Sequence, residues 1–275
     1  MSLSPFVPWR LTRIIAGQAS TVHGSVVAEE PLEIQLNGEP VAVLMRLPGD
    51  EKALAIGFCI TEGLIAHYAD IRLVFHCGSA TEGESVPGED SANRVRIVAD
   101  RTAPDPAAKL LRLIRSGCGG IEVTEVAADI PAVSSDLHVS PDVLWALPKT
   151  MAASQRSYRA AGGVHAAAVF DSEGRLVVVK EDIGRHNAAD KAIGECIIQG
   201  VGLQDKIMLI TGRASHEMVM KAARVGMPVL VSLSSPTSLA LQMAERLNCT
   251  TIGYLRGHRM SVYTHPWRVA ESPSK

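Results

Sequence analysis

The sequence predicts an α/β protein with a C-terminal core in which a parallel-rich sheet is covered by helices. From Gly162 onward, short apolar runs alternate with segments of helical spacing, and the connections between them are short. The chain has 275 residues, of which 47 % are hydrophobic and 20 % charged, which is enough to bury a sizeable core. The pattern changes near residue 140, so we expect a smaller N-terminal α+β part at 28–139 and an α/β core at 140–270.

The N-terminal part begins with residues 1–27, which show no regular pattern and are expected to form an irregular leader. Strands at 33–36 and 41–46 are predicted to form a hairpin, because Asn37–Gly38 between them tolerates positive φ. Asp50 is expected to cap a helix that ends at about Glu62. The other elements expected in this part are strands at 71–77 and 94–99 and a helix at 104–115.

The C-terminal core is expected to start with a helix at Ser140–Pro141, with serine as N-cap and proline in the first turn. Strands and helices then alternate, as a parallel sheet with crossover helices requires. The strands are expected at 164–170, 176–180, 207–210, 229–231 and 251–254, and the helices at 185–198, 215–225 and 237–247.

Composition excludes several classes of protein. The net charge of -2 and the aromatic content of 4 % argue against nucleic-acid binding, which needs a basic surface or stacking platforms. No segment reaches the roughly 18 to 20 apolar residues of a membrane span, and the N-terminus lacks the apolar core of a signal peptide. The five cysteines are widely spaced and form no C-x-x-C pair, so neither a disulfide framework nor a cysteine-rich zinc site is expected. We expect a cytoplasmic protein.

Three polar turns follow predicted strands, at 211–215, 234–238 and 254–259. In an open α/β sheet, ligands bind beyond the carboxyl ends of the strands, and helix N-termini there attract phosphate. Each turn alone is read more simply as an ordinary helix cap. Three of them on one edge, two with arginines, favour a crevice for a nucleotide-like ligand with a pyrophosphate. The candidate ligand-binding residues are Arg213, Ser215, Tyr254, Leu255, Arg256, Gly257, His258 and Arg259.

The segment Glu181–Asn187 places two carboxylates, a guanidinium, an imidazole and an amide within seven residues. Such groups are costly to bury unless they pair with each other or contact a ligand. The segment is therefore either a ligand-orienting network or a buried ion-pair network that holds a strand to a helix. We favour a role in the site and add His186 to the candidate ligand-binding residues.

His165 lies in an apolar strand, where a single histidine is more often a core residue than a ligand. A zinc deaminase would carry His-x-Glu here and Pro-Cys-x-x-Cys further on. Ala167 occupies the position of that glutamate, and the paired cysteines are missing. We therefore expect neither zinc nor any other bound metal.

Cys118 lies between glycines in a short turn after Arg115, which predicts an exposed thiol. A thiol close to an arginine can be partly thiolate, and a thiolate can carry sulfur as a persulfide. The alternative is an incidental surface cysteine. The other cysteines have mainly apolar neighbours and are expected to be small buried hydrophobic residues.

These motifs, read in order, resemble the formate dehydrogenase accessory sulfurtransferase family from about residue 28 to 268. The most specific match is the string Glu181–Lys191. The other matching segments are 30–34 with Asn37–Gly38, 47–50, 54–58, 61–63, 162–167, 211–215 with Glu217, Met218 and Lys221, 236–240 and 262–264.

The resemblance implies a cytidine-deaminase-like fold without zinc. It also implies a homodimer that carries sulfur from a cysteine desulfurase to formate dehydrogenase. The acceptor would be the bis-molybdopterin guanine dinucleotide cofactor, contacted through Tyr254–Arg259. Family members usually carry Cys-Gly-x-Cys-Gly in a loop, and the first cysteine takes the persulfide. Cys118 matches that cysteine, whereas Ile121 and Glu122 replace the second cysteine and the glycine after it. The chain is therefore either a one-cysteine sulfur carrier or a cofactor-binding chaperone that has lost sulfur transfer.

Overall fold

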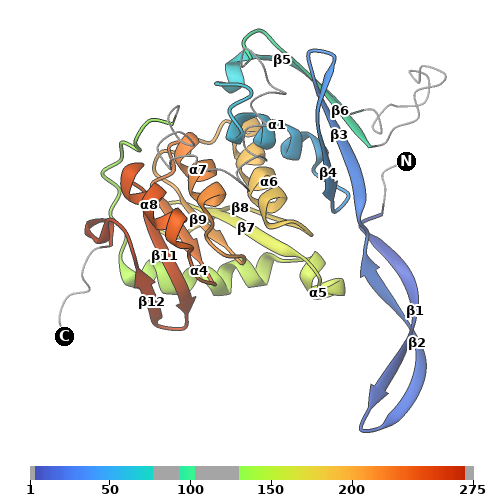
Figure 1. Ribbon diagram of the computed structural model, residues 1–275. Helices are drawn as coiled ribbons and strands as arrows, with labels where there is room; N and C mark the ends of the chain where they lie inside the picture. Colours follow the sequence, from blue (N-terminus) through green and yellow to red (C-terminus); the bar gives the residue numbers. More distant parts are fainter. Residues whose placement is uncertain (1–3, 77–92, 103–129, 270–275) are drawn as a thin grey trace.

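The computed structural model describes residues 4–76, 93–102 and 130–269, in which the strands form three sheets (Figure 1). β1 (Phe6–Ile15) and β2 (Gln18–Val27) form a two-stranded ribbon that projects from the rest of the molecule. The second sheet contains β3 (Glu30–Leu36), β4 (Glu39–Arg46), β5 (Ile71–His76) and β6 (Arg94–Ala99). Its strand order is β4-β3-β6-β5.

The third sheet has six strands in the order β12-β11-β10-β9-β7-β8. Its strands are β7 (His165–Phe170), β8 (Leu176–Asp182), β9 (Ile207–Ile210), β10 (Val229–Ser232), β11 (Thr250–Arg256) and β12 (Arg259–Val262). Among the described strands, parallel pairing is confined to β9, β10 and β11, so the expected parallel-rich sheet is in fact mixed. The reason is local: β7–β8 and β11–β12 are joined by short turns, which can connect only antiparallel neighbours.

Helices cover both faces of the six-stranded sheet, which confirms the predicted α/β class and its three layers. α6 (Arg185–Ile198), α7 (His216–Arg224) and α8 (Ser238–Arg246) pack on one face through a core that includes Val169 and Ile210. α4 (Pro141–Ser154) packs on the other face, against Phe170 and Leu209 (Figure 1). Successive residues of a strand point to opposite faces, so these buried strands are apolar on both sides.

α1 (Glu51–Thr61) joins the two larger sheets. One side of α1 packs on the inner face of the four-stranded sheet, where Leu32, Ile34 and Leu54 are fully buried. Its other side lies against α6 so closely that a Cβ on Gly194 would stand 1.9 Å from the Ala53 carbonyl oxygen. All strands of the four-stranded sheet lie within residues 28–139, and all strands of the six-stranded sheet lie within residues 140–270. The contact between α1 and α6 brings the two sheets together.

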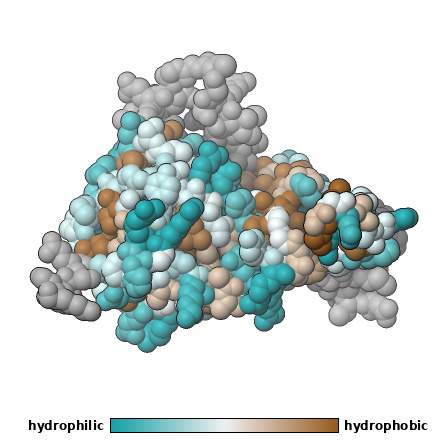
Figure 2. Space-filling view, turned by 90° about the horizontal axis from the view of Figure 1, so that it is seen from below, coloured by the Kyte–Doolittle hydropathy of each residue, from teal (hydrophilic) through white to brown (hydrophobic). Residues whose placement is uncertain are grey.

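The expectation of an irregular leader at residues 1–27 is wrong, because residues 6–27 form the ribbon. Its turn, Ala16–Gly17, has positive φ at both residues, as tight hairpins need. Alanine is an unusual residue there, and Pro8 interrupts the apolar pattern, so the sequence signal for a hairpin is weak. Hydrophobic side chains gather on the ribbon (Figure 2), and the exposed fraction of Trp9 is 59 %.

The remaining predicted elements agree closely with the structure wherever it describes them. The hairpin at Asn37–Gly38 is confirmed, and the Ser140 hydroxyl caps α4 by accepting from the Val143 amide at 3.3 Å. Asp50 is different: it lies before α1 with φ 60° and caps nothing with its side chain, which instead binds Lys180 at 2.7 Å. The predicted helix at 104–115 lies outside the described residues. No helix among those described has the length and apolar character needed to cross a membrane.

Candidate functional site

The three polar turns predicted to share one edge of the sheet do lie side by side. Ala214 and Pro236 form a bridge between the first two turns, and the Ala214 amide donates to the Ser235 carbonyl at 3.2 Å. The third turn joins them where the Tyr254 amide donates to the Ser234 carbonyl at 2.9 Å. The turns therefore form one continuous surface at the carboxyl ends of β9, β10 and β11.

The third turn differs from the other two because it leads into a strand, not a helix. β11 bulges at Tyr254, which has φ 56°, and the chain reverses at Gly257–His258 into β12. The Leu255 side chain is fully buried in the core, so it cannot contact a ligand. The other five candidates of this turn are exposed, and the His258 ring meets Trp145 of α4 edge-on at 5.0 Å.

The helix N-termini at the first two turns differ in how they are capped. The Thr237 hydroxyl caps α8 by accepting from the Ala240 amide at 3.3 Å. Ser215 precedes α7 but makes no capping bond, and its Oγ is buried without a hydrogen-bond partner among the described residues. The start of α7 thus lacks a side-chain cap, the buried Ser215 hydroxyl lacks a partner there, and Arg213, two residues earlier, is exposed.

β7 runs antiparallel to β9, which brings His165 to the same edge. Its Nδ1 lies 3.2 Å from the Thr211 hydroxyl. Gly212 follows, and a Cβ there would stand 3.1 Å from Cδ of Arg185, so glycine allows the guanidinium stem to cross the turn. Burial, then the charges of Arg185 and His186, lower the pKa of His165. His165 is therefore a neutral imidazole beside a cation at neutral pH.

Arg185 and His186 are the first residues of α6 and lie next to α7. Nε of Arg185 is buried without a hydrogen-bond partner among the described residues. His186 Nε2 lies 2.9 Å from the Glu217 carboxylate, in the first turn of α7. The hydrogen bond from His186 lowers the pKa of Glu217 to about 2, so this carboxylate is ionised and paired. The one acidic group in the first turn of α7 is thus engaged by His186.

The residues of Glu181–Asn187 divide between the two roles considered for this segment, a ligand-orienting network and a buried network that holds a strand to a helix. The Glu181 carboxylate accepts from three amides at the start of α5 (Ser157–Ala161), the closest at 2.7 Å. Asp182 is fully buried, and pairs with Lys191 at 2.8 Å. Asn187 donates to the Met45 carbonyl at 2.8 Å. These residues hold the fold together, and only Arg185 and His186 face the edge with the three turns.

A second buried network ties α1 to α6 and α7 behind this edge. The Lys221 ammonium contacts Glu62 at 2.6 Å, Asp190 at 3.0 Å and the Thr61 hydroxyl at 2.9 Å. Burial alone would lower the pKa of Lys221, but the two carboxylates more than offset it and the pKa is raised. The network surrounds the one ammonium with two carboxylates and a hydroxyl, and it holds together the elements that carry the site.

Three of the five cysteines are buried in the core: Cys59, Cys196 and Cys249. Burial raises the pKa of Cys59 and raises the pKa of both Cys196 and Cys249 to about 12. These three thiols are therefore protonated and unreactive at neutral pH, as their apolar sequence neighbours predicted. The predicted sulfur-carrying residue, Cys118, and its neighbour Ile121 lie outside the described residues.

Sequence reasoning missed His165 as a member of this edge, and it did not single out Thr211 or Arg185 within the segments that it assigned to the site. The signal for Arg185 was present in its position at the start of a helix after a strand. His165 gave no such signal, because its place at the edge depends on β7 being antiparallel to β9. Within the described ranges, no group of three or more His, Cys, Asp or Glu side chains is arranged to hold a metal ion. The edge presents mainly hydrogen-bond donors and cations, so it suits an anion.

The fold and this edge define a three-layer α/β protein with three adjoining polar turns beyond the carboxyl ends of its parallel strands. A model of the FdhD/NarQ family matches residues 27–270. The chain is 40 % identical to the sulfur carrier protein FdhD of Streptomyces coelicolor, over 95 % of this chain and 94 % of that protein. It is 36 % identical to the protein of the same name from Bacillus subtilis, over 96 % of each. The chain therefore belongs to the FdhD/NarQ family.

A solved structure supports the same assignment at the level of the fold. A protein from Desulfotalea psychrophila, described as a formate dehydrogenase accessory protein, superposes with a TM-score of 0.77. The match covers 97 % of this chain and all of that one, at 25 % sequence identity. The overall mixed α/β architecture is thus shared with that protein.

Proposed function

We propose that this protein is a sulfur carrier required for formate dehydrogenase activity. The observation that carries the proposal is family membership: relatives up to 40 % identical over nearly the whole chain are named sulfur carrier proteins. The donor is a cysteine desulfurase, and the acceptor is the bis-molybdopterin guanine dinucleotide cofactor before its insertion into formate dehydrogenase. The carrier acts as a homodimer in the cytoplasm.

Cys118 is the proposed sulfur-carrying residue. Its thiolate attacks the outer sulfur of a persulfide on the desulfurase, the donor S–S bond breaks, and the desulfurase thiolate leaves. Cys118 then holds the persulfide, with no net oxidation or reduction, because sulfane sulfur has passed from one thiolate to another. The raised pKa values of Cys59, Cys196 and Cys249 support this assignment by removing three of the five thiols from consideration.

The cofactor is cargo in this proposal, and its guanine dinucleotide end would bind the crevice. Its pyrophosphate needs donors and positive charge. Ser215 Oγ and Arg185 Nε are buried polar atoms that lack partners in the described part of the chain, and both lie at the crevice. The free N-terminus of α7 and the exposed Arg213 add further donors. The exposed residues of Tyr254–Arg259 would contact the guanylyl group.

The sequence departure at Ile121 favours a second candidate function, a chaperone that binds the cofactor without transferring sulfur. The two functions differ in their need for Cys118. Formate dehydrogenase activity should be measured in cells that lack the native protein and express either wild type or Cys118→Ala. We expect wild type to restore activity, Cys118→Ala to lose nearly all of it, and Cys77→Ala to serve as the thiol control. Full activity with Cys118→Ala would reject sulfur transfer and leave the chaperone.

A further inference from the structure

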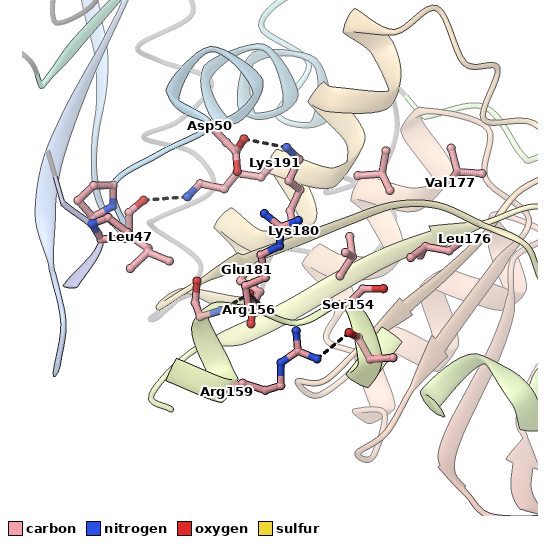
Figure 3. A pocket seen from close by; sticks show the side chains of 16 residues that line it. Leu47, Asp50, Ser154, Arg156, Arg159, Leu176, Val177, Lys180, Glu181 and Lys191 are labelled. Atoms are coloured by element: carbon pink, nitrogen blue, oxygen red, sulfur yellow. Dashed lines mark hydrogen bonds and ion pairs between the residues drawn. The ribbon is translucent and has the colours of Figure 1, made fainter. Parts of the chain in front are cut away.

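A groove of about 690 Å³ lies along β8, away from the three turns (Figure 3). Six consecutive residues of β8, Leu176–Glu181, form its floor. One wall comes from the segment before α1, with Leu47 and Pro48, and from Lys191 of α6. The other wall is formed by the end of α4 and the start of α5, with Ser154 and Arg159. The floor is therefore a strand, and both walls stand beside it.

Among the described strands, β8 lies at one end of the six-stranded sheet and pairs with β7 alone. The Ala166 carbonyl accepts from the first amide after β9, so the main chain of Ala166 faces β9. Alternate residues of an antiparallel strand face opposite neighbours, so Ala167 and its partner Lys180 bond across β7–β8. The amides and carbonyls of Val179 and Glu181 then point away from β7, into the groove. In the described part of the chain they have no main-chain partner.

The charges of the groove are unbalanced. Its lining includes four basic and two acidic side chains. Both carboxylates are already engaged: Asp50 binds Lys180, and Glu181 binds the amides of α5. Arg156 and Arg159 are exposed on the same wall, and neither forms an ion pair with another described residue. The groove therefore combines an unpaired strand edge, apolar side chains and two cations that attract negative charge.

We propose that this groove binds an extended acidic peptide segment of a partner protein, which adds to the sheet as a strand beside β8. The main chain of the peptide would bond to the outward amides and carbonyls of Val179 and Glu181. Its carboxylates would pair with Arg156 and Arg159, and alternate apolar side chains would contact Leu47 and Leu176. The proposal does not depend on sulfur transfer, since the residues that line the groove include none from the three turns.

The test measures binding of a panel of blocked synthetic peptides in which valine, isoleucine or threonine alternates with glutamate. Calorimetry on the full chain should show binding, and the same peptides with N-methylated amides should bind at least about tenfold more weakly. Val179→Pro should weaken binding by a similar factor, because it removes an outward amide without breaking the β7–β8 ladder. The methylated peptides leave the protein unchanged, so they remain decisive if the proline variant does not fold.

Charge is tested with the double variant Arg156→Glu/Arg159→Glu, which should reverse the preference from glutamate peptides to matching lysine peptides. Arg10→Glu/Arg13→Glu, two exposed arginines on the ribbon, is the matched control and should bind like wild type. Absence of peptide binding, or binding indifferent to N-methylation, would overturn the proposal. A third result would also overturn it: the wild-type protein is a dimer that binds no peptide, and Val179→Pro converts it to monomers. A second copy of the chain would then occupy the groove.

Discussion

Two side chains at the crevice hold buried polar atoms that no other described residue satisfies, the hydroxyl of Ser215 and Nε of Arg185. A buried donor without a partner costs free energy, and a bound phosphate oxygen would recover it. The Glu217 carboxylate is engaged by His186, and the Arg185 guanidinium lies close to His165. These contacts support the proposal that the edge binds an anion.

Ser215→Ala and Arg185→Ala should each weaken the binding of guanosine diphosphate by about ten- to a hundredfold, the effect of losing a hydrogen bond to a charged group. Calorimetry on the purified protein would measure both dissociation constants, with Arg10→Ala on the distant ribbon as control. Wild-type affinity in both variants would show that the phosphate does not bind at the start of α7.

The stability of the folded protein at low pH tests the contact between Glu217 and His186. The pKa of Glu217 is about 2 in the folded protein, against an ordinary value of 4.5, so the unfolded chain binds the proton more tightly. The stabilisation is complete above about pH 4.5 and is lost as the pH falls through about 2. Urea midpoints measured across this range should fall less steeply for Glu217→Gln than for wild type. Parallel pH profiles would mean that the contact contributes no stability.

At the scale of elements, the contact between α1 and α6 decides how the two larger sheets sit together. Gly57 and Gly194 make this contact possible: a Cβ on Gly57 would stand 1.9 Å from the Asp190 carbonyl oxygen. The clash would be with main-chain atoms, which cannot turn aside as a flexible side chain can. Sequence analysis did not identify either glycine as a contact residue, because a close approach of two helices leaves no local pattern.

Gly194→Ala should lower the free energy of unfolding by roughly 1–3 kcal/mol, even though alanine favours a helix more than glycine does. The matched control is Gly202→Ala, where the new Cβ would approach only the end of the Gln204 side chain, at 3.2 Å. Urea denaturation of both variants would measure the difference. Equal stability of the two would show that α1 and α6 have room to separate.

The elements of the C-terminal core could be predicted well because their signals are local. α6 and β9 have the predicted bounds, since apolar periodicity, capping residues and short turns determine where such elements begin and end. Sheet order and strand direction depend on contacts between distant segments, so the antiparallel placement of β7 and the position of His165 could not be read from sequence. The ribbon was missed because it has few buried residues to reveal its period of two.

At the scale of the whole molecule, the crevice joins turns from three separate strands, and the buried network around Lys221 holds the helices behind it. The resemblance of the sequence to its family predicted the fold, and the alternation of strands and helices predicted the set of polar turns. Neither could predict that Leu255 is buried or that Glu181 and Asp182 are structural, because these depend on packing. The central claim is that Cys118 carries sulfur. This is a chemical reaction, and it can be tested directly on the purified protein.

The most direct measurement is the intact mass of the purified protein after incubation with a cysteine desulfurase and cysteine, under non-reducing conditions with peptide mapping. Our account predicts the addition of sulfur on the peptide that contains Cys118, and no addition in Cys118→Ala. An unmodified Cys118, with the desulfurase shown to be active on a control acceptor, would contradict a one-cysteine carrier.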